Sequence, residues 1–330
     1  MDVFIHSRFD AEFRRHPLVL IDVGARGGVK SNWARAERHL RSFGFEPDKG
    51  EFSRLVAQSK ANQTATFFET ALHSRRGPIR LNIARDRGLT SVFEPDREFV
   101  DAFPEATRFD VVDTQQVDAD TLDNQLQSHG VSDVDFVKVD TQGSELFVLE
   151  GARHALDSTV FGVEAEVEFT PIYRGQPLFS DVDKYLRERG FLLFSLRPCY
   201  WKRAAGRSLG GPRGQIIWAD TLYLKRPDAF QQSLAELEPE RRRSKILRAI
   251  SICLLYGYCD YALEISRRVG EALSPEDRDV IERQLRETTA RSIAIPGRRQ
   301  LAAAFHRLWK VFASRSEGWS VSDPELGNPD

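Results

Sequence analysis

The chain has 330 residues, of which 41% are hydrophobic and 29% are charged, and its formal net charge is −2. This length is expected to hold one full α/β domain with an additional segment, and this composition excludes wholesale disorder. The near-neutral charge provides no global field that would attract nucleic acid, so no nucleic-acid partner is expected.

Cysteine usage and apolar patterning indicate a cytoplasmic protein. Cys199, Cys253 and Cys259 are odd in number and lack metal-ligand spacing, which disfavours a disulfide framework and favours a reducing compartment. The first residues show no basic segment followed by an apolar run, so no secretory signal is expected. The most apolar late stretch, residues 246–265, is interrupted by charged side chains, so no transmembrane segment is expected.

Residues 1–17 are expected to form an N-terminal segment, and residues 18–226 a domain in which apolar runs alternate with amphipathic stretches. This alternation predicts a Rossmann-like α/β fold, with a mostly parallel sheet sandwiched by helices. Continuous apolar runs are typical of strands that are buried on both faces. Strands are expected at residues 18–21, 43–45, 65–68, 134–139, 160–167, 191–196 and 221–224, with an inserted strand and loop at 79–92.

The first expected strand leads into a glycine-rich turn at residues 22–28, Asp-Val-Gly-Ala-Arg-Gly-Gly. Glycines in such a turn let a ligand approach the backbone and the N-terminus of the next helix. A dinucleotide-binding loop would carry glycine where this chain has Arg26 and Val29. The loop therefore suits a nucleoside-like ligand better than a pyrophosphate, and a plain strand-to-helix turn is the alternative.

Glu46 lies 24 residues after Asp22, at the end of the next expected strand. A carboxylate at this place can accept hydrogen bonds from ribose hydroxyls. Together with the loop, it favours an adenosine site. The alternative is a solvent-facing glutamate before the turn at Pro47.

Asp140 follows the strand expected at 134–139, within the run Val-Asp-Phe-Val-Lys-Val-Asp-Thr-Gln-Gly-Ser-Glu at residues 134–145. Ligands of open α/β sheets bind at the carboxyl ends of the strands, so Asp140 is a candidate to contact the reacting groups. The alternative is that Asp140 caps the helix expected to begin near Ser144.

Glu164, Glu166 and Glu168 alternate with apolar residues and therefore share one face of the strand at 160–167 and its continuation. Three carboxylates on a covered face would be too costly, so this face is expected to open to solvent or to a cleft. Since the strand neighbours the one at 134–139, the expected cleft is the substrate crevice. Glu164 and Glu168 fit a solvated edge equally well.

The helix before the strand at 191–196 is expected to begin at Ser180, with Asp183 completing a capping box and Gly190 ending the helix. A polar linker is expected at 227–240, a helical appendage at 241–313 and a polar tail at 314–330. A homodimer through the appendage is one expectation. A chain ending near Pro227 is expected to keep its cofactor site.

Several of these motifs also carry a family resemblance. Over roughly residues 18–226, the chain resembles the FkbM family of S-adenosylmethionine-dependent methyltransferases. Two positions depart from the family pattern: Arg26 stands where Asn is frequent, and Gln142 where many members have Glu. The resemblance is carried by Asp22-Val23-Gly24-Ala25, Phe45-Glu46-Pro47, Thr121-Leu122-Asp123, residues 135–145, Leu149-Glu150-Gly151-Ala152 and Phe169-Thr170-Pro171-Ile172-Tyr173.

The resemblance implies a class I methyltransferase-like fold and S-adenosyl-L-methionine as cofactor. It implies O-methylation of a sugar, glycolipid or secondary metabolite. Cofactor contacts are implied at the glycine-rich loop, at Glu46 and at the pair after the third strand. The residues concerned are Asp22, Gly24, Ala25, Arg26, Gly28, Glu46, Ala71 and Leu72.

A hydroxyl acceptor must lose its proton, and the candidate general bases are Asp140 first and Glu166 second. His73 and Tyr173 are candidates for substrate contact, and Trp201 and Trp218 for lining the acceptor pocket or packing beneath it. The chain offers no dedicated ligand cluster, so no metal is assigned. The alternatives are a nicotinamide-dependent Rossmann oxidoreductase and a non-catalytic scaffold that recruits a partner through its later helices.

Overall fold

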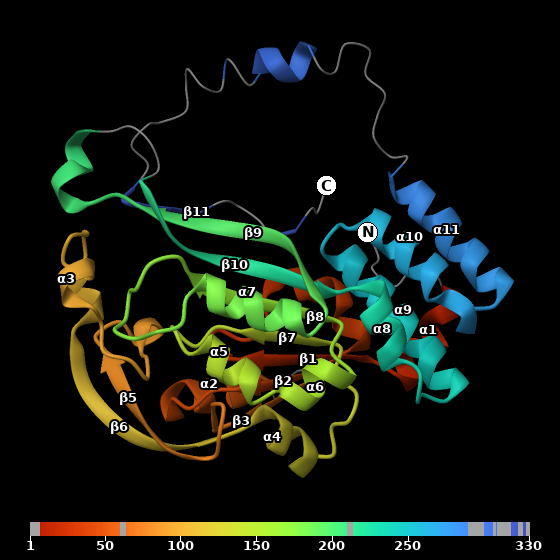
Figure 1. The fold of residues 1–330 in the computed structure, drawn as a ribbon, viewed down its shortest axis with the longest axis horizontal. Helices are drawn as coiled ribbons and strands as arrows, with labels where there is room; N and C mark the ends of the chain where they lie inside the picture. The colour runs from red at the N-terminus through yellow and green to blue at the C-terminus, as the bar shows by residue number, and fades with distance from the viewer. Residues whose placement is uncertain are drawn as a thin grey trace.

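An eight-stranded sheet forms the centre of the molecule (Figure 1). The computed structural model describes residues 7–59, 64–209, 214–289, 300–305, 308, 318–322 and 326–327. The strand order β11-β9-β10-β8-β7-β1-β2-β3 combines a parallel part with an antiparallel part, which confirms the predicted mainly parallel α/β class. The parallel strands are β3 (Ala65–Phe68), β2 (Leu40–Phe45), β1 (Leu18–Val23), β7 (Phe136–Val139) and β8 (Gly162–Glu168), and the antiparallel ones are β10 (Gln215–Lys225), β9 (Phe191–Trp201) and β11 (Ser320–Ser322).

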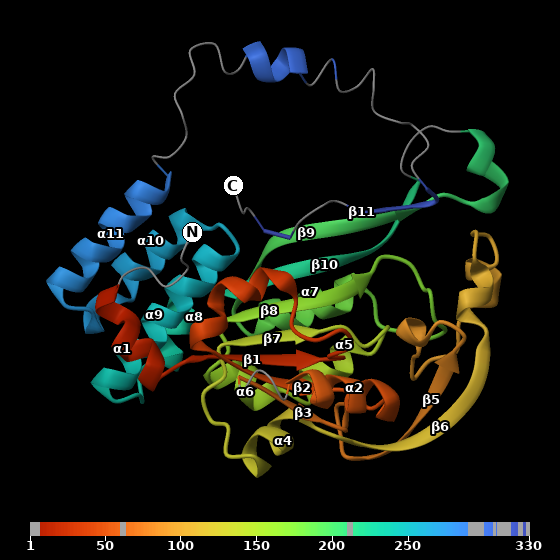
Figure 2. The same ribbon diagram turned by 180° about the vertical axis from the view of Figure 1, so that it is seen from behind.

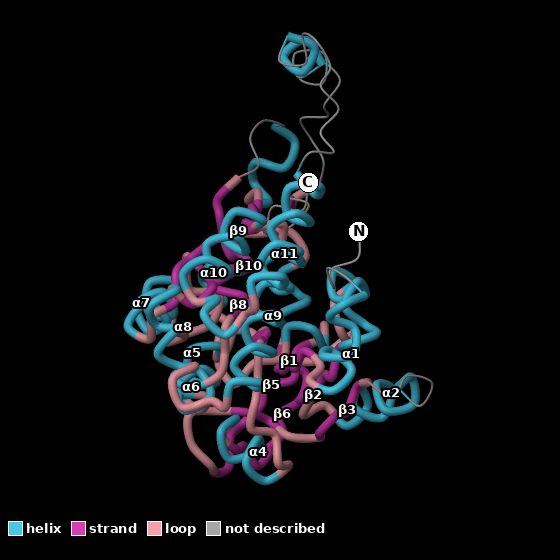
Figure 3. The backbone as a smooth tube through the Cα atoms, turned by 90° about the vertical axis from the view of Figure 1, so that its right-hand side faces the viewer, coloured by secondary structure: helices cyan, strands magenta, loops and turns pink. Residues whose placement is uncertain are grey.

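Helices cover both faces of this sheet, because successive side chains of each buried strand point to opposite sides. In β1, Leu18 and Leu20 belong to one hydrophobic core, whereas Val19 and Ile21 belong to the other. Figures 1 and 2 show the two faces from the front and the back, and Figure 3 shows the sheet from its side. One core includes α4 (Leu122–Ser128), α5 (Glu145–Glu150), α6 (Arg153–Ser158) and α7 (Phe179–Glu188), and the other α1 (Ser7–Arg15), the 3-10 helix η1 (Ser31–His39), α8 (Pro227–Ser233) and α9 (Pro239–Leu255).

A smaller sheet is inserted between β3 and α4, in the order β4-β6-β5. The strand predicted within 79–92 is β5 (Gly77–Ala84), which pairs antiparallel with β6 (Val111–Asp120). The strand β6 was not predicted, because its polar side chains are exposed along most of its length and give no buried-strand pattern. The remaining elements of this region are β4 (Ala71–Leu72), η2 (Arg87–Leu89), α3 (Arg97–Val100) and η3 (Ala106–Phe109), and α2 (Lys49–Ser59) precedes β3.

The helix α7 begins one residue before Ser180, so the predicted capping box was wrong. The side chain that caps the helix is Asp181, whose Oδ2 accepts the backbone N–H of Leu178 at 2.9 Å. Asp183 instead pairs with Arg187 and accepts the hydroxyl of Tyr223. The predicted exit at Gly190 is present, with φ at 79°.

The expected linker and appendage contribute to the core. Residues 227–240 contain α8, whose Phe230 is fully buried. In α9, every residue from Ser244 to Leu255 is buried, so this part of the helix offers no surface for a dimer contact. The homodimer through the helices of the appendage stays a prediction. It is followed by α10 (Cys259–Arg268), η5 (Gly270–Ala272) and α11 (Pro275–Thr289). A chain ending near Pro227 would expose one face of the sheet, and we now expect it not to fold.

The expected polar tail also differs from the structure, because residues 320–322 form β11 at the edge of the large sheet. No helix among the described segments combines the length and apolar character needed to cross a bilayer.

Two buried cations fasten α9 to the amino-terminal end of β7. The Nζ of Lys245 lies 2.6 Å from Asp133 Oδ1 and 2.8 Å from Asp135 Oδ1. Arg248 contacts the same two carboxylates. Asp135 Oδ2 also accepts the backbone N–H of Val19, so the cluster joins α9, β1 and β7. Lys245 and Asp135 are each 1% exposed, so breaking the pair would leave a charge uncompensated in the interior.

Replacing Lys245 by methionine is expected to lower the free energy of unfolding by about 3 kcal/mol, because Asp135 loses a buried partner. Arg241→Met is the matched control, since Arg241 is exposed on the same helix, and should change stability by less than about 0.5 kcal/mol. Urea unfolding followed by circular dichroism measures both variants. Equal effects would show that the buried pair does not anchor the helix.

Candidate functional site

A cavity of about 230 Å³ lies at the carboxyl ends of β1, β2 and β7. The loop after β1 contributes Gly24 and Arg26, the end of β2 leads to Glu46, and Asp140 follows β7. The inserted sheet closes the cavity with apolar side chains of β5. Because β2 and β7 flank β1 on opposite sides, the cavity lies where open parallel sheets bind ligands.

Gly24 allows the β1 loop and the β7 loop to touch. Its φ of +70° is unfavourable for other residues, and a Cβ built on it would lie 1.9 Å from the carbonyl oxygen of Asp140. The backbone N–H groups of Gly24 and Ala25 both donate to the carbonyl of Phe45. The glycine therefore fixes three strand ends around the cavity.

Glu46 is buried at the wall of the cavity, with 5% of its surface exposed. Its Oε1 accepts the backbone N–H of Asp48 at 2.9 Å, and this is the one hydrogen bond that the carboxylate makes to the described residues. Burial raises the pKa of Glu46 above its usual value. Arg26 stands at the rim, 3.4 Å from Asp48 and 3.8 Å from Glu51.

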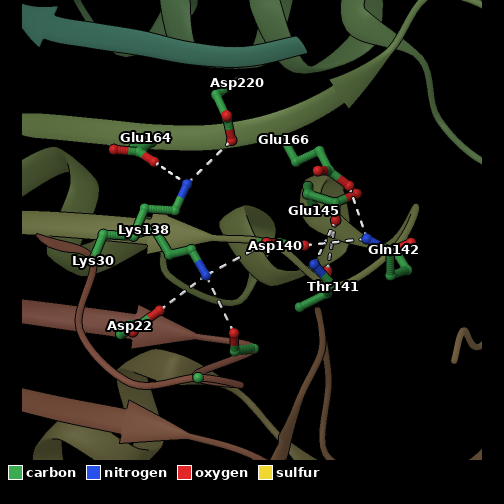
Figure 4. Close-up of polar contacts among 12 residues, drawn as sticks. Asp22, Lys30, Lys138, Asp140, Thr141, Gln142, Glu145, Glu164, Glu166 and Asp220 are labelled. Atoms are coloured by element: carbon green, nitrogen blue, oxygen red, sulfur yellow. Dashed lines mark hydrogen bonds and ion pairs between the residues drawn. The ribbon is translucent and has the colours of Figure 1, made fainter. Parts of the chain in front are cut away.

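Lys138 joins the ends of β1 and β7 beneath the cavity (Figure 4). Its Nζ lies 3.1 Å from Asp22 Oδ1 and 3.6 Å from Asp140 Oδ2, and it donates to the carbonyl of Gly24 at 3.2 Å. Burial alone would lower the pKa of Lys138, but the carboxylates of Asp22 and Asp140 outweigh it and raise the pKa. The lysine stays charged and holds the two loops together.

Lys30, which directly precedes η1, reaches two buried carboxylates on β8 and β10 (Figure 4). Its Nζ lies 2.6 Å from Glu164 Oε1 and 3.3 Å from Asp220 Oδ1, and Tyr256, directly after α9, donates to Glu164 Oε2 at 2.8 Å. Glu164 and Glu168 are each 2% exposed, so the expectation that this face opens to solvent was wrong for both. For Glu164, the Lys30 ammonium supplies the counter-charge that makes burial tolerable.

Gln142 links the two carboxylates that were predicted to be catalytic. Its Nε2 donates to Asp140 Oδ1 at 3.2 Å and to Glu166 Oε1 at 2.8 Å (Figure 4). Its φ of 57° is rare for a residue other than glycine, and such backbone strain concentrates at functional sites. A glutamate here would add a third negative charge, whereas the amide can donate to both neighbours.

The turn after β7 is fastened by Glu145 and not by Asp140. The carboxylate of Glu145 accepts the backbone N–H groups of Thr141 at 2.6 Å and Gly143 at 3.0 Å. The N-terminus of α5 has no side-chain cap, so the alternative of Asp140 as a helix cap is contradicted. The Asp140 carboxylate instead faces Lys138 and Gln142.

A second pocket of about 200 Å³ lies on the other side of Gln142. Gln142 lines both pockets, Asp140 lines the first and Glu166 lines the second. The second pocket has aromatic walls, formed in part by the two tryptophans predicted to lie near an acceptor, Trp201 and Trp218. The two pockets therefore share Gln142 as a wall, and each has one of the two carboxylates in its lining.

Some of the predicted cofactor-binding residues line the first cavity, and the others do not. One set is buried or faces elsewhere: Asp22 pairs with Lys138, Ala25 is fully buried, and Gly28 lines a separate groove. The set that lines the first cavity comprises Gly24, Arg26, Glu46, Ala71 and Leu72.

Neither residue predicted to touch substrate lines one of the two pockets. The ring of His73 packs on Phe147 with centroids 4.8 Å apart, and burial and the charge of Arg75 lower the pKa of His73. Tyr173 is 1% exposed, and its hydroxyl lies 3.1 Å from Gln142 Oε1. Tyr173 therefore supports Gln142 and does not face a ligand.

Sequence reasoning missed Lys30, Lys138 and Trp319. For Lys138 a signal was present, because Asp22 and Lys138 each interrupt an apolar strand run and the strands place them in register. Lys30 and Trp319 gave no comparable signal, since their partners are distant in the sequence.

The chain is similar in sequence to known methyltransferases. The profile of the family described as methyltransferase FkbM domain matches residues 22–193. The 2-O-methyltransferase NoeI of Sinorhizobium fredii (strain NBRC 101917 / NGR234) is 23% identical over 187 residues, which are 54% of this chain and 75% of that protein.

Two solved structures resemble the chain with low TM-scores. The methyltransferase FkbM from Methylobacillus flagellatus KT is 14% identical with a TM-score of 0.36, over 63% of this chain and 43% of that one. This chain thus spans less than half of that protein. M. capricolum TrmK in complex with S-adenosyl-homocysteine is 10% identical with a TM-score of 0.30, over 84% of this chain and 99% of that one. Similarities this weak support no functional inference.

Replacing Gly24 by alanine tests the contact between the two loops. We expect a loss of about 2–5 kcal/mol in the free energy of unfolding, from the left-handed backbone and from the clash with Asp140. Gly27→Ala is the control, because Gly27 has φ at +84° but its added Cβ would meet no atom within 4 Å. Its cost should be about 1–2 kcal/mol. Equal losses in urea unfolding would show that the close approach is unimportant.

Proposed function

The chain belongs to the FkbM methyltransferase family, and on this premise we propose that it transfers a methyl group from S-adenosyl-L-methionine to a hydroxyl group. The acceptor is a sugar, a glycolipid or a hydroxylated secondary metabolite. The observation that carries the proposal is the meeting of two pockets at Gln142, between the carboxylates of Asp140 and Glu166. The relative NoeI is by name a 2-O-methyltransferase, which supports oxygen as the acceptor atom.

The first cavity has a hydrogen-bond acceptor and an apolar surface that suit the cofactor. Glu46 has a carboxylate oxygen that accepts no hydrogen bond from the described residues, as a ribose diol would require. Ala71, Leu72 and the apolar residues of β5 offer a surface for the adenine ring, and Gly24 leaves the backbone open. When bound, the cofactor supplies an electrophilic methyl group. Asp140 lines the cavity at the end nearest Gln142 and Glu166.

The acceptor hydroxyl needs a base on the side of the second pocket. Glu166 lines that pocket, whereas Asp140 lines the cofactor cavity and faces Lys138 at 3.6 Å. We therefore place Glu166 ahead of Asp140 as the proton acceptor. Burial and the neighbouring Asp140 charge raise the pKa of Glu166 well above its usual value, which makes its ionised form a stronger base. Gln142 and Asp140 position the carboxylate by hydrogen bonding and charge.

Glu46→Ala is expected to weaken S-adenosylhomocysteine binding about ten-fold to a hundred-fold, because charge-assisted hydrogen bonds to the ribose are lost. Isothermal titration calorimetry measures the affinity, and cooperative thermal unfolding checks the fold. Glu69→Ala is the control, since Glu69 is exposed just after β3 and does not line the cavity. An unchanged affinity in Glu46→Ala would remove Glu46 from the site.

The base assignment predicts a distinct pH profile for each variant. In the wild type, kcat/KM for methylation of methyl glycosides should rise as pH increases through the raised pKa of Glu166. Glu166→Gln should lower turnover about 10²–10⁴-fold and abolish this acidic limb. Asp140→Asn should shift the limb to lower pH, because one charge that raises the pKa of Glu166 is removed. Near-wild-type turnover in Glu166→Gln would transfer the role to Asp140.

A further inference from the structure

The second pocket is completed by a segment that lies far from the family match. Trp319 and Ser320 line it together with Gln142 and Glu166. The family match ends at residue 193, so these two side chains come from beyond it. The pocket therefore combines residues of the matched stretch with residues beyond it, namely Trp201 of β9, Trp218 of β10 and the segment 318–322.

Residues 318–322 are held against the edge strand β9 by several independent contacts. The strand β11 pairs antiparallel with β9, with Ser320 opposite Trp201. The backbone N–H of Lys202 donates to the carbonyl of Trp319 at 2.8 Å, and Cys199 Sγ lies 3.4 Å from Ser320 Oγ. These contacts set the position of Trp319 relative to the pocket.

The aromatic wall depends on Trp319. Its ring lies against Trp201 with centroids 5.3 Å apart and planes at 64°, and Trp201 packs in turn on Phe103 at 5.4 Å. Trp319 is 9% exposed, so it is covered on most sides and turns its remaining surface toward the pocket. Trp218 contributes another indole.

The pocket combines features that suit a single hydroxylated ring. Indole faces offer apolar contact to the C–H groups of a ring, and the Glu166 carboxylate can accept a hydrogen bond from a hydroxyl. Since Glu166 is at the same time the proposed base, the ring would be held with one hydroxyl beside it.

We propose that residues 318–322 form the acceptor-side wall of the active site, and that Trp319 determines which ring is accepted. This inference rests on the proposed function, because it requires that the second pocket holds the methyl acceptor. It assigns no part of cofactor binding to Trp319, which does not line the first cavity.

The test uses the full chain saturated with S-adenosylhomocysteine and titrated with a panel of methyl glycosides, with tryptophan fluorescence as the readout. We expect Trp319→Ala to weaken glycoside binding at least about ten-fold, and Trp319→Phe to restore part of the loss because it keeps an aromatic face. Val321→Ala is the matched control, because it trims the same strand at a residue that does not line the pocket.

The outcomes separate this inference from the function on which it rests. Calorimetry should give the same S-adenosylhomocysteine affinity for wild type, Trp319→Ala and Val321→Ala. Absence of cofactor binding in the wild type would overturn the proposed function itself. Normal cofactor binding with no glycoside binding, or with equal glycoside affinity in wild type and Trp319→Ala, would overturn the role of residues 318–322 alone. Equal weakening by Trp319→Ala and Val321→Ala would reduce Trp319 to a packing residue.

Discussion

The loops around the first cavity depend on one buried cation, the ammonium of Lys138. Asp22, Lys138 and Glu164 occupy neighbouring positions across β1, β7 and β8, so a row of charges crosses the middle of the sheet. Lys138 is 7% exposed and contacts Asp22, Asp140 and the Gly24 carbonyl. A carboxylate in such a place would be costly without a counter-charge. The lysine therefore permits Asp140 to lie between the two pockets and fixes the loop that borders the first cavity.

The residues between the two pockets have different roles. Glu145 uses its carboxylate to shape the turn, and Tyr173 supports the amide of Gln142 from below. Gln142 in turn connects Asp140 with Glu166. The side-chain amide of Gln142 donates to both carboxylates, and these hydrogen bonds offset the strain of its backbone φ of 57°. The arrangement holds two carboxylates close together without requiring both to face solvent.

Features that depend on a few adjacent residues could be predicted from the sequence. Features that depend on partners far away in the sequence could not. The sequence predicted the apolar run of β1, the loop at Gly24 and the place of Glu46, because each depends on a few adjacent residues. Burial of Glu164 was not, since its partner Lys30 lies 134 positions away. The role of α9 was hidden for the same reason: Lys245 and Arg248 look like surface residues until Asp133 and Asp135 are placed beside them. The strand β6 gave no apolar pattern at all.

The burial of α9 from Ser244 to Leu255 shows that the stretch matched by the family and the folding unit differ in extent. The stretch shared with the family, residues 22–193, is an evolutionary module, but its sheet is covered on one face by α8 and α9 and is extended by β10. The folding unit is therefore larger than the inherited one. Recombination between relatives at the end of the shared stretch would cut through a continuous hydrophobic core, so β10, α8 and α9 must diverge together with the sheet that they cover.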